Sequence, residues 1–448
     1  MTTRREFLRS TAFGAAGLTL GSLGVSAKNM SAMAGANDKV RVGIVGFSDR
    51  TRYSLIPAFQ QFAKALNFEI VAVSDIWSLR RKEAEEFFKK EYNQKVKLFR
   101  NNEELYNSKT VDAVIIATAD FQHATHCIEA MKAGCDAYVE KPFAETMEDN
   151  RAARDAVRAA EKIVQIGSQR RSAPNYHSAA DYIQSGKFGK VNIVEMCWNV
   201  NQPGRWRRPA LVAKCFEKDL DWKRYLLNRP FEEFDPRKYL EYRLFWPFSS
   251  GIPGQWMSHQ IDTVHWFMQL NHPRSVAANG DVYFWKDGRQ NADTMTAVFD
   301  YGDASGKENF QVVYSSRMHN GAGGTKELYF SNGGTLNLDT NKVTSDGGLT
   351  QKMADEMGMQ SFLLPEYELP SFSAETAAIT GSDPMTALHM KNWMECVRSR
   401  KQPNAPVDAG YNHSVANIMT TAALRTGEKA TFDEAAQEVL AGGKVFKY

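Results

Sequence analysis

The 448-residue sequence has few cysteines and no long hydrophobic run. Its five cysteines (Cys127, Cys135, Cys197, Cys215 and Cys396) are scattered, and no two form a CxxC pair. This spacing excludes a disulfide framework and cysteine-based zinc sites, and the HExxH metal motif is also missing. We therefore expect no metal. Because a spanning helix needs about 20 apolar residues, we expect no membrane anchor.

Apart from its N-terminus, the sequence also has no excess of positive or negative charge. The formal net charge of +3 is carried by the first 36 residues, which contain four basic residues and one acidic residue. A neutral protein lacks the basic surface that nucleic acids or anionic membranes require. We therefore expect a small-molecule ligand and no nucleic acid. The length and the 43% apolar content leave room for two hydrophobic cores.

Residues 1–36 are predicted to be an export signal that is not part of the fold. The basic segment "TRREFLRS" is followed by the mildly apolar "TAFGAAGLTLGSLGV", and small residues then offer cleavage sites after Ala27 and Ala36. The pair Arg4-Arg5 resembles a twin-arginine signal. Such signals export proteins that have already folded in the reducing cytoplasm, which agrees with the few cysteines. The predicted location is periplasmic, or otherwise exported.

Short apolar segments alternate with helical segments between residues 37 and 168. The predicted strands are 39–47, 68–75, 111–120, 136–142 and 164–169, and the predicted helices are 54–66, 79–91, 123–134 and 148–163. Ser54 is a possible N-cap of the first helix. This alternation predicts an α/β fold that begins with a doubly wound parallel sheet of the Rossmann type.

Longer strands follow between residues 169 and 448. They are expected at 190–201, 276–285, 293–301, 309–317 and 325–332, with helices at 255–270, 385–400 and 411–427. This pattern predicts a second α/β domain with an open, mostly antiparallel sheet. We expect residues 385–448 to pack back on the core.

The segment "VGIVGFSDRTR", residues 42–52, begins like a dinucleotide-binding turn. Gly46 occupies the first glycine position of that fingerprint, whereas Ser48 and Thr51 occupy the second and third. Asp75 ends the second strand, where a carboxylate accepts the ribose hydroxyls and repels a 2′-phosphate. This favours NAD over NADP, although the nearby Arg80 and Arg81 leave NADP open.

Two further polar segments follow predicted strands, "ATADFQH" (117–123) and "YVEKPFAET" (138–146). The carboxyl ends of parallel strands are where open α/β sheets bind ligands. Lys141 stands where the nicotinamide would lie, and it could orient a substrate hydroxyl. Pro142 is a candidate for a cis peptide bond.

The order of these motifs resembles the Gfo/Idh/MocA oxidoreductase family. The matching segments include "VGIVG", "VIIATADFQHATHCIEAMKAG", "YVEKPFAET", "VQIGSQRRSAPNY", "WRRP" and "WMSHQIDTVHWFM". The resemblance implies a Rossmann domain, a second α/β domain used for substrate binding and oligomerisation, bound NAD(P), and a sugar or polyol substrate. A homo-oligomer, either a dimer or a tetramer, is therefore expected.

The resemblance also implies roles for individual residues. Lys141 and His259 correspond to the family's lysine and general-base histidine. Asp262, one helical turn after His259, could fix its imidazole tautomer. Gln255 stands where many members carry an aspartate. The expected cofactor contacts are Gly46, Phe47, Ser48, Asp75, Thr118, Asp120, His123, Glu140, Lys141 and Gln169. The expected substrate contacts are Arg170, Arg171, Tyr176, Trp206, Arg207, Gln255 and His259, with Trp222 and Trp246 as further candidates.

Three functions fit these observations. The first is an exported NAD-dependent oxidoreductase that acts on a ring hydroxyl of a sugar or glycoside and retains its cofactor. The second is an NAD-dependent glycoside hydrolase, which uses transient oxidation and elimination without net redox change. The third is a non-catalytic sugar-binding protein, which the glutamine at position 255 and the incomplete glycine fingerprint favour.

Overall fold

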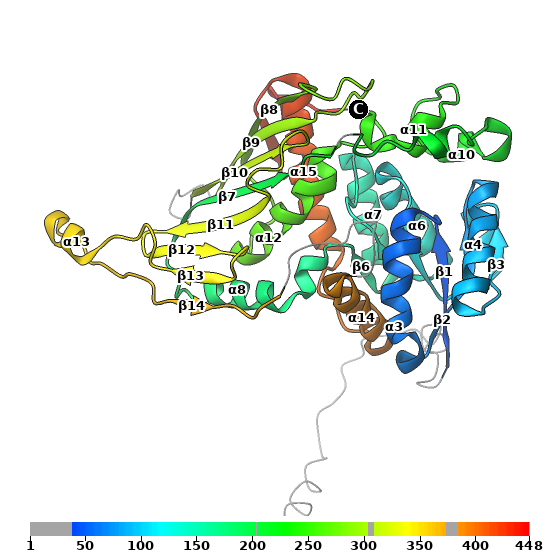
Figure 1. Ribbon diagram of the computed structural model, residues 1–448, viewed down its shortest axis with the longest axis horizontal. Helices are drawn as coiled ribbons and strands as arrows, with labels where there is room; N and C mark the ends of the chain where they lie inside the picture. The colour runs from blue at the N-terminus through cyan, green and yellow to red at the C-terminus, as the bar shows by residue number, and fades with distance from the viewer. Residues whose placement is uncertain (1–37, 203, 303–308, 373–382, 448) are drawn as a thin grey trace, which may run out of the picture. The chain divides into compact units, whose positions relative to one another are not determined.

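The computed structural model describes residues 38–202, 204–302, 309–372 and 383–447, so the predicted export signal lies outside the described residues. Residues 39–448 are one compact unit, which contains two sheets (Figure 1). The α/β fold class is confirmed, because a parallel sheet is followed by a mostly antiparallel one.

The first sheet is parallel throughout its six described strands and has the order β3-β2-β1-β4-β5-β6. This is the strand order of a dinucleotide-binding Rossmann fold. The strands are β1 (Val40–Val45), β2 (Phe68–Ser74), β3 (Lys97–Phe99), β4 (Ala113–Ile116), β5 (Asp136–Val139) and β6 (Val164–Ile166). The connecting helices are α3 (Ile56–Leu66), α4 (Ser78–Tyr92), α5 (Asn102–Asn107), α6 (His123–Ala133) and α7 (Met147–Ala160).

Both faces of the first sheet are buried, which explains why its strands are apolar almost throughout. One face packs on α6 and α7. The other packs on α3 and on a helix from the far end of the chain, α14 (Pro384–Ser399). In Figure 1, α14 and α3 lie side by side.

The helix after β1 corrects one sequence-based expectation. It begins at Asp49 rather than after Ser54, and it passes through a wide π-helical turn, η1 (Thr51–Leu55), before α3. The Ser48 hydroxyl caps it, accepting a hydrogen bond from the Thr51 backbone N–H at 3.2 Å. Ser54 is buried inside the helix, where its hydroxyl accepts from Arg50 at 2.8 Å.

The second sheet has eleven strands within the described ranges, in the order β14-β13-β12-β11-β7-β10-β9-β8-β15-β16-β17. Only the central pair β7–β10 is parallel there. The strands are β7 (Val191–Asn199), β8 (Ser275–Asp281), β9 (Thr294–Tyr301), β10 (Phe310–Arg317), β11 (Thr325–Ser331), β12 (Gly334–Asn337), β13 (Lys342–Thr344), β14 (Tyr367–Glu368), β15 (Ala430–Asp433), β16 (Glu438–Ala441) and β17 (Lys444–Val445).

Three long helices cover one face of this sheet: α8 (Pro174–Gln184), α12 (Ser258–Met268) and α15 (Val407–Thr426) (Figure 1). A π-helical turn, η6 (Pro253–Met257), leads into α12. The shorter helices are α9 (Pro209–Val212), α10 (Trp222–Leu226), α11 (Pro236–Leu240) and α13 (Gln351–Met357).

Strand β8 is shorter than the sequence pattern indicates. It ends at Asp281, because the Asp293 carboxylate accepts the backbone N–H groups of Tyr283, Phe284 and Trp285 at 2.6–3.1 Å. Those donors are therefore not available to a β ladder. Separately, no helix in the described part of the chain has both the length and the hydrophobicity that a bilayer span requires.

Candidate active site

A cavity of about 550 Å³ lies along the carboxyl edge of the first sheet and extends to residues of the second. Most of the predicted site residues line it. They are Gly46, Phe47, Ser48, Asp75, Thr118, His123, Glu140, Lys141 and Gln169 on the Rossmann side, and Trp206, Gln255 and His259 on the other side. The cavity therefore joins motif groups from two separate parts of the sequence, and Lys141 and His259, for example, are more than 100 residues apart.

The turn after β1 brings the backbone close to the neighbouring strand. Gly46 has a φ of +85°, and a Cβ there would lie 2.7 Å from Thr118 Cγ2. Glycine is thus required at this position both for its backbone conformation and for space. Ser48 and Thr51, at the other two glycine positions of the fingerprint, have structural roles that glycine could not fill. Ser48 caps the helix, and the Thr51 hydroxyl donates to the Gly46 carbonyl at 2.9 Å.

Asp75 is held rigidly beside this turn. Its two carboxylate oxygens accept the backbone N–H groups of Phe47 and Trp77, each at 2.9 Å. Burial raises the pKa of Asp75 above its ordinary value, and those two N–H groups oppose the rise. The carboxylate is thus oriented by the same turn that approaches the cavity.

Lys141 follows β5 and reaches across to the second part of the chain. The Lys141–Pro142 peptide bond is cis, as predicted. The lysine ammonium donates to the Gln255 carbonyl oxygen at 2.5 Å. Burial lowers the pKa of Lys141 to about 8, although the Glu140 and Asp120 carboxylates oppose the shift. Glu140 pairs with Arg50 at 2.9 Å.

His259, in the first turn of α12, presents its ring to the same cavity. The ring lies beside Trp198, with 5.8 Å between centroids, and it has no hydrogen-bond partner among the residues described. Burial, and then the positive charges of Lys141 and Arg170, lower the pKa of His259 well below its usual value. The imidazole is therefore neutral at physiological pH and able to accept a proton.

Gln255 is a junction between the two parts of the site. Its side-chain amide donates to Asp120 Oδ2 at 2.6 Å, and its side-chain oxygen accepts from Arg243 Nε at 2.7 Å. With the Lys141 contact, three polar groups of this residue are fixed. A carboxylate is thus present near position 255 after all, but it belongs to Asp120, in the segment between β4 and α6.

Several predicted contacts do not reach the cavity. Asp120 is buried between Ser249 and Gln255, to which it is hydrogen-bonded. Asp262 pairs with Arg171 at 2.7 Å rather than with His259, so neither its expected tautomer role nor the expected sugar contact of Arg171 is available.

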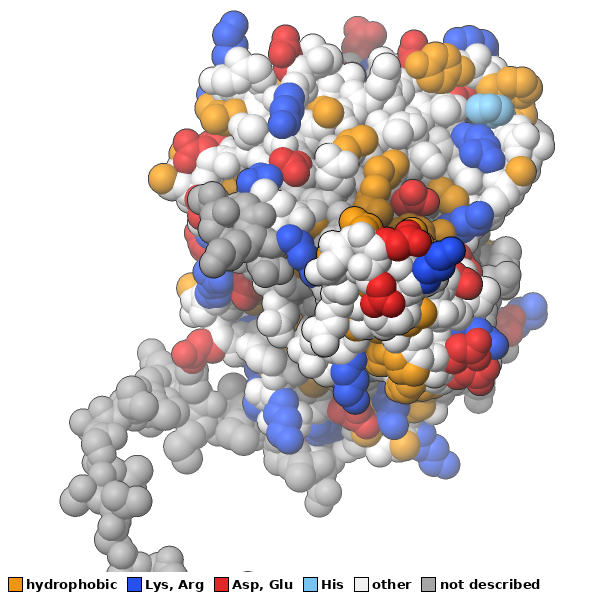
Figure 2. Space-filling model, turned by 90° about the vertical axis from the view of Figure 1, so that its left-hand side faces the viewer, with side chains coloured by type: hydrophobic (Ala, Val, Ile, Leu, Met, Phe, Trp, Pro, Cys, Tyr) orange, Lys and Arg blue, Asp and Glu red, His pale blue; other side chains and the backbone are white. Residues whose placement is uncertain are grey.

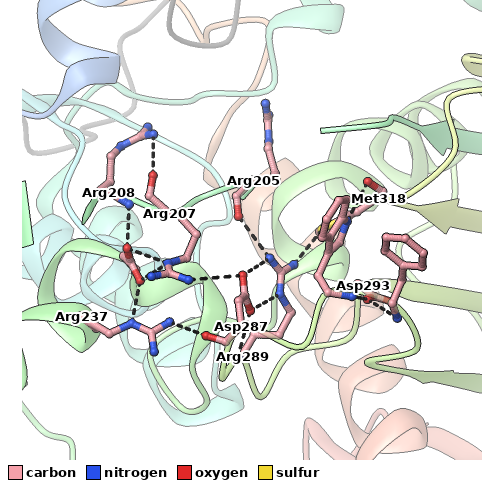
Figure 3. A network of polar contacts seen from close by, with 11 residues as sticks. Arg205, Arg207, Arg208, Arg237, Asp287, Arg289, Asp293 and Met318 are labelled. Carbon is pink, nitrogen blue, oxygen red and sulfur yellow. Dashed lines mark hydrogen bonds and ion pairs between the residues drawn. The ribbon is translucent and has the colours of Figure 1, made fainter. Parts of the chain in front are cut away.

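Three further predicted substrate contacts also bind other side chains of the protein: Arg170, Tyr176 and Arg207. Arg170 and the Tyr176 hydroxyl both contact the buried Glu327. Figure 3 shows Arg207 held in a network of polar contacts, where its guanidinium pairs with Glu241 and Asp287. Trp222 is a core residue whose indole donates to the Glu232 carbonyl, and Trp246 does not line the cavity.

Sequence reasoning missed several residues that do line the cavity: Arg50, Trp198, Arg205, Arg208, Tyr242, Arg243 and Trp256. The segment "WRRP" was recognised, but only the structure shows that Arg208 and the preceding Arg205, rather than Arg207, line the cavity. The rings of Trp198 and Trp256 are stacked, with 6.0 Å between their centroids, and both residues line the cavity. Within the described residues, no group of three or more His, Cys, Asp or Glu side chains could hold a metal ion.

Comparison with known proteins identifies the first domain. Residues 40–168 match the GFO_IDH_MocA model, an oxidoreductase family with an NAD-binding Rossmann fold. This segment is thus similar to the NAD-binding Rossmann domain of that oxidoreductase family. Its cofactor is therefore NAD, as the sequence predicts.

Curated relatives match part of the chain. An inositol 2-dehydrogenase from Salmonella typhimurium is 28% identical over 166 residues, which is 37% of this chain and 48% of that protein. A scyllo-inositol 2-dehydrogenase (NAD(+)) from Bacillus subtilis is 36% identical over 87 residues, which is 19% of this chain and 25% of that protein. The chain thus spans about half the length of the first of these relatives and a quarter of the second.

Solved structures match both domains. The WlbA dehydrogenase from Bordetella pertussis, in complex with NADH and UDP-GlcNAcA, has a TM-score of 0.63 at 16% identity, covering 88% of this chain and 99% of that one. Levoglucosan dehydrogenase, in complex with NADH and levoglucosan, has the same TM-score at 14% identity and the same coverage. At these identities the likeness shows the fold.

The residues along the cavity fit an NAD molecule. The Gly46–Ser48 turn leads into a helix N-terminus, a position that binds phosphates, and Asp75 stands where the adenosine ribose is expected. Two buried polar atoms in the cavity lining, Gln169 Oε1 and His123 Nε2, have no hydrogen-bond partner within the described structure. These atoms and Lys141 would surround the nicotinamide end.

Proposed function

We propose that the protein oxidises a ring hydroxyl of a sugar or glycoside, with NAD as the cofactor. The observation that carries this proposal is that His259 and Lys141 reach the cavity that begins at the dinucleotide turn. Bound NAD would accept the hydride. The stacked indoles of Trp198 and Trp256, which line the cavity, suit a sugar ring, and the relatives and neighbours include inositol and levoglucosan dehydrogenases.

His259 and Lys141 would share the handling of the proton. The neutral His259 imidazole takes the proton of the reacting hydroxyl, and the Lys141 ammonium orients and polarises that oxygen. General base catalysis of this kind contributes about 10²–10⁴-fold. Gln255, fixed by Asp120 and Arg243, would hold Lys141 in place through its backbone carbonyl.

The test is a comparison of the wild type with His259→Asn. We expect kcat to fall by about 10²–10⁴-fold, while the Kd for NAD+ stays within a factor of about two. His177→Asn, an exposed histidine of α8, is the matched control and should have wild-type activity. Mass spectrometry of the product distinguishes the reactions, since an oxidoreductase yields a keto sugar, whereas a hydrolase releases an aglycone without net redox change. A protein that binds no NAD would contradict both reactions.

We also propose that the protein is exported through the twin-arginine route with its cofactor already bound. The supporting observation is the N-terminal sequence, with Arg4-Arg5 before a short apolar stretch. Cofactor retained in this way must be regenerated in place. The expectation is that nicotinamide dinucleotide is released on denaturing the protein purified from the periplasmic fraction, and that Arg4→Lys/Arg5→Lys leaves the protein in the cytoplasm.

A homo-oligomer is proposed as well. Large hydrophobic side chains are exposed on and after α13, including Met353, Met357 and Phe362 at 50%, 63% and 52%. Figure 2 faces this end of the molecule. Such clustered exposure is typical of an interface. Light scattering should give a dimer or tetramer mass, and Met357→Glu with Phe362→Glu should lower it; a monomer at all concentrations of the wild type would contradict the proposal.

A further inference from the structure

Two arginines that line the cavity, Arg205 and Arg243, have no carboxylate partner in the described part of the chain. Arg243 donates to the side-chain oxygen of Gln255, and Arg205 donates to that of Gln202. The Nε atom of Arg205 is buried without any partner there. The guanidinium group of Arg205 therefore carries a positive charge that no neighbouring anion balances. Arg243 has no directly paired carboxylate either, although Asp120 and Glu140, together with Tyr242, act on it from further away and raise its pKa against the effect of burial.

The other arginines that line this cavity are paired with acids. Arg50 lies 2.9 Å from Glu140, Arg80 lies 3.1 Å from Asp49, Arg208 lies 3.7 Å from Asp49, and Arg224 lies 3.0 Å from Glu103. The lack of a partner is thus particular to Arg205 and Arg243, and it is not a general property of the cavity.

Both unpaired arginines lie at the His259 end of the cavity. Arg205 stands over the ring of Trp256 at 5.6 Å. Trp256 stacks on Trp198, whose ring is beside His259. Arg243 contacts Gln255, the residue before Trp256. The arginines near the dinucleotide turn, in contrast, are Arg80 and Arg208, which are both paired with Asp49.

The backbone of Arg205 is held so that its side chain is presented to the cavity. Figure 3 shows its carbonyl oxygen accepting from Arg289, 3.4 Å away, while its guanidinium points away from the network. Burial, together with the positive charges of Arg243 and Arg208, lowers the pKa of Arg205 to about 10. An arginine is placed beside other cations only at a cost in free energy, which a bound anion would offset.

We propose that the substrate is an anionic sugar whose carboxylate or phosphate is bound by Arg205 and Arg243. The inference rests on the proposed function, because that function makes the His259 end of the cavity the substrate site. Arginine forks bind carboxylate and phosphate oxygens with paired hydrogen bonds. The ring would lie against Trp256 and Trp198, with its reacting hydroxyl toward His259.

The test is calorimetric titration of the NAD-loaded protein with three ligands that share one ring: glucose, glucuronate and glucose 6-phosphate. We expect at least one of the two anions to bind about 10-fold or more tightly than glucose, with an affinity that falls as salt is added. Arg205→Gln and Arg243→Gln should each weaken that anion's binding by about 10- to 100-fold and weaken glucose binding much less. Arg224→Gln, an arginine of the same cavity that is paired with Glu103, is the control.

Three results would overturn the inference. The first is equal binding of the neutral sugar and both anions. The second is wild-type anion affinity in both arginine variants. The third is a larger loss of NAD+ affinity than of anion affinity in those variants, which would assign the two arginines to the cofactor. The NAD+ titration also separates this inference from the proposed function, because a protein that binds no NAD+ contradicts the function itself.

Discussion

At the residue scale, the site depends on a few side chains that are hydrogen-bonded to Gln255. Lys141 and His259 could be located from the sequence because each stands in a short motif next to a predicted element. The partners of Gln255 could not, since Asp120 and Lys141 come from strand ends more than 100 residues earlier. Only tertiary packing shows that the carboxylate missing from position 255 is supplied by Asp120.

The same limit explains the misassigned arginines. Arg170 and Arg171 follow a strand end, as cavity residues should, but their guanidinium groups turn toward the buried acids Glu327 and Asp262. A sequence pattern gives the position of an arginine and not the acid that will neutralise it. In "GRWRRP", likewise, nothing in the spacing shows that Glu241 binds Arg207.

A pH dependence follows from the buried ammonium of Lys141. Its pKa is lowered to about 8, so the charged form is complete below about pH 7 and is lost as the pH rises through 8. His259, with a pKa well below its usual value, stays neutral over this range. We therefore expect kcat/KM to fall about tenfold for each pH unit above 8, with no loss between pH 6 and 7.

The measurement is the pH profile of kcat/KM for the wild type and for Lys141→Arg. Arginine stays protonated throughout, so the alkaline decrease should disappear in this variant, whatever its absolute rate. A decrease near pH 8 that remains in Lys141→Arg would show that another group titrates.

At the scale of elements, the helix that follows β1 shows why the glycine fingerprint was hard to interpret. The sequence correctly placed the strand, the turn and a helix, but the helix starts at Asp49, five residues before the predicted cap at Ser54. Two features hid this start. The π-helical turn at Thr51–Leu55 breaks the ordinary helical period. In addition, proline is usually found in the first turn of a helix, so Pro57 suggests a later start.

Ser48 is therefore predicted to act as a helix cap as well as a dinucleotide contact. Ser48→Ala removes the acceptor for the Thr51 N–H and should lower the free energy of unfolding by about 1 kcal/mol, whereas Ser48→Gly should lower it by only a few tenths. Since glycine lets the backbone approach phosphate, NAD+ affinity in Ser48→Gly should be equal to that of the wild type or higher. Chemical denaturation and NAD+ titration of both variants check this, and complete loss of binding in Ser48→Gly would show that the turn is misplaced.

At the scale of the whole molecule, the Rossmann domain is completed from outside its own segment. Helix α14 contributes Met390, Trp393 and Met394 to the core under the first sheet. The Trp393 ring lies 6.3 Å from Phe68 and 6.0 Å from Tyr138. The sequence predicts a helix at this position, but helical periodicity alone does not say which of two cores receives its apolar face.

This packing predicts that both sheets unfold together. Trp393→Ala should lower the free energy of unfolding by about 3–5 kcal/mol, because it removes a fully buried indole from the first core. Circular dichroism and loss of NAD+ binding should follow one shared transition, both in this variant and in the wild type. Lys391→Ala, a partly exposed position of α14, is the control and should change the transition little.

The isolated segment 37–168 lacks α14, and we expect it to bind NAD+ only weakly or to remain unfolded. A fragment with wild-type NAD+ affinity and its own cooperative transition would show that the first core is complete without the C-terminal helix.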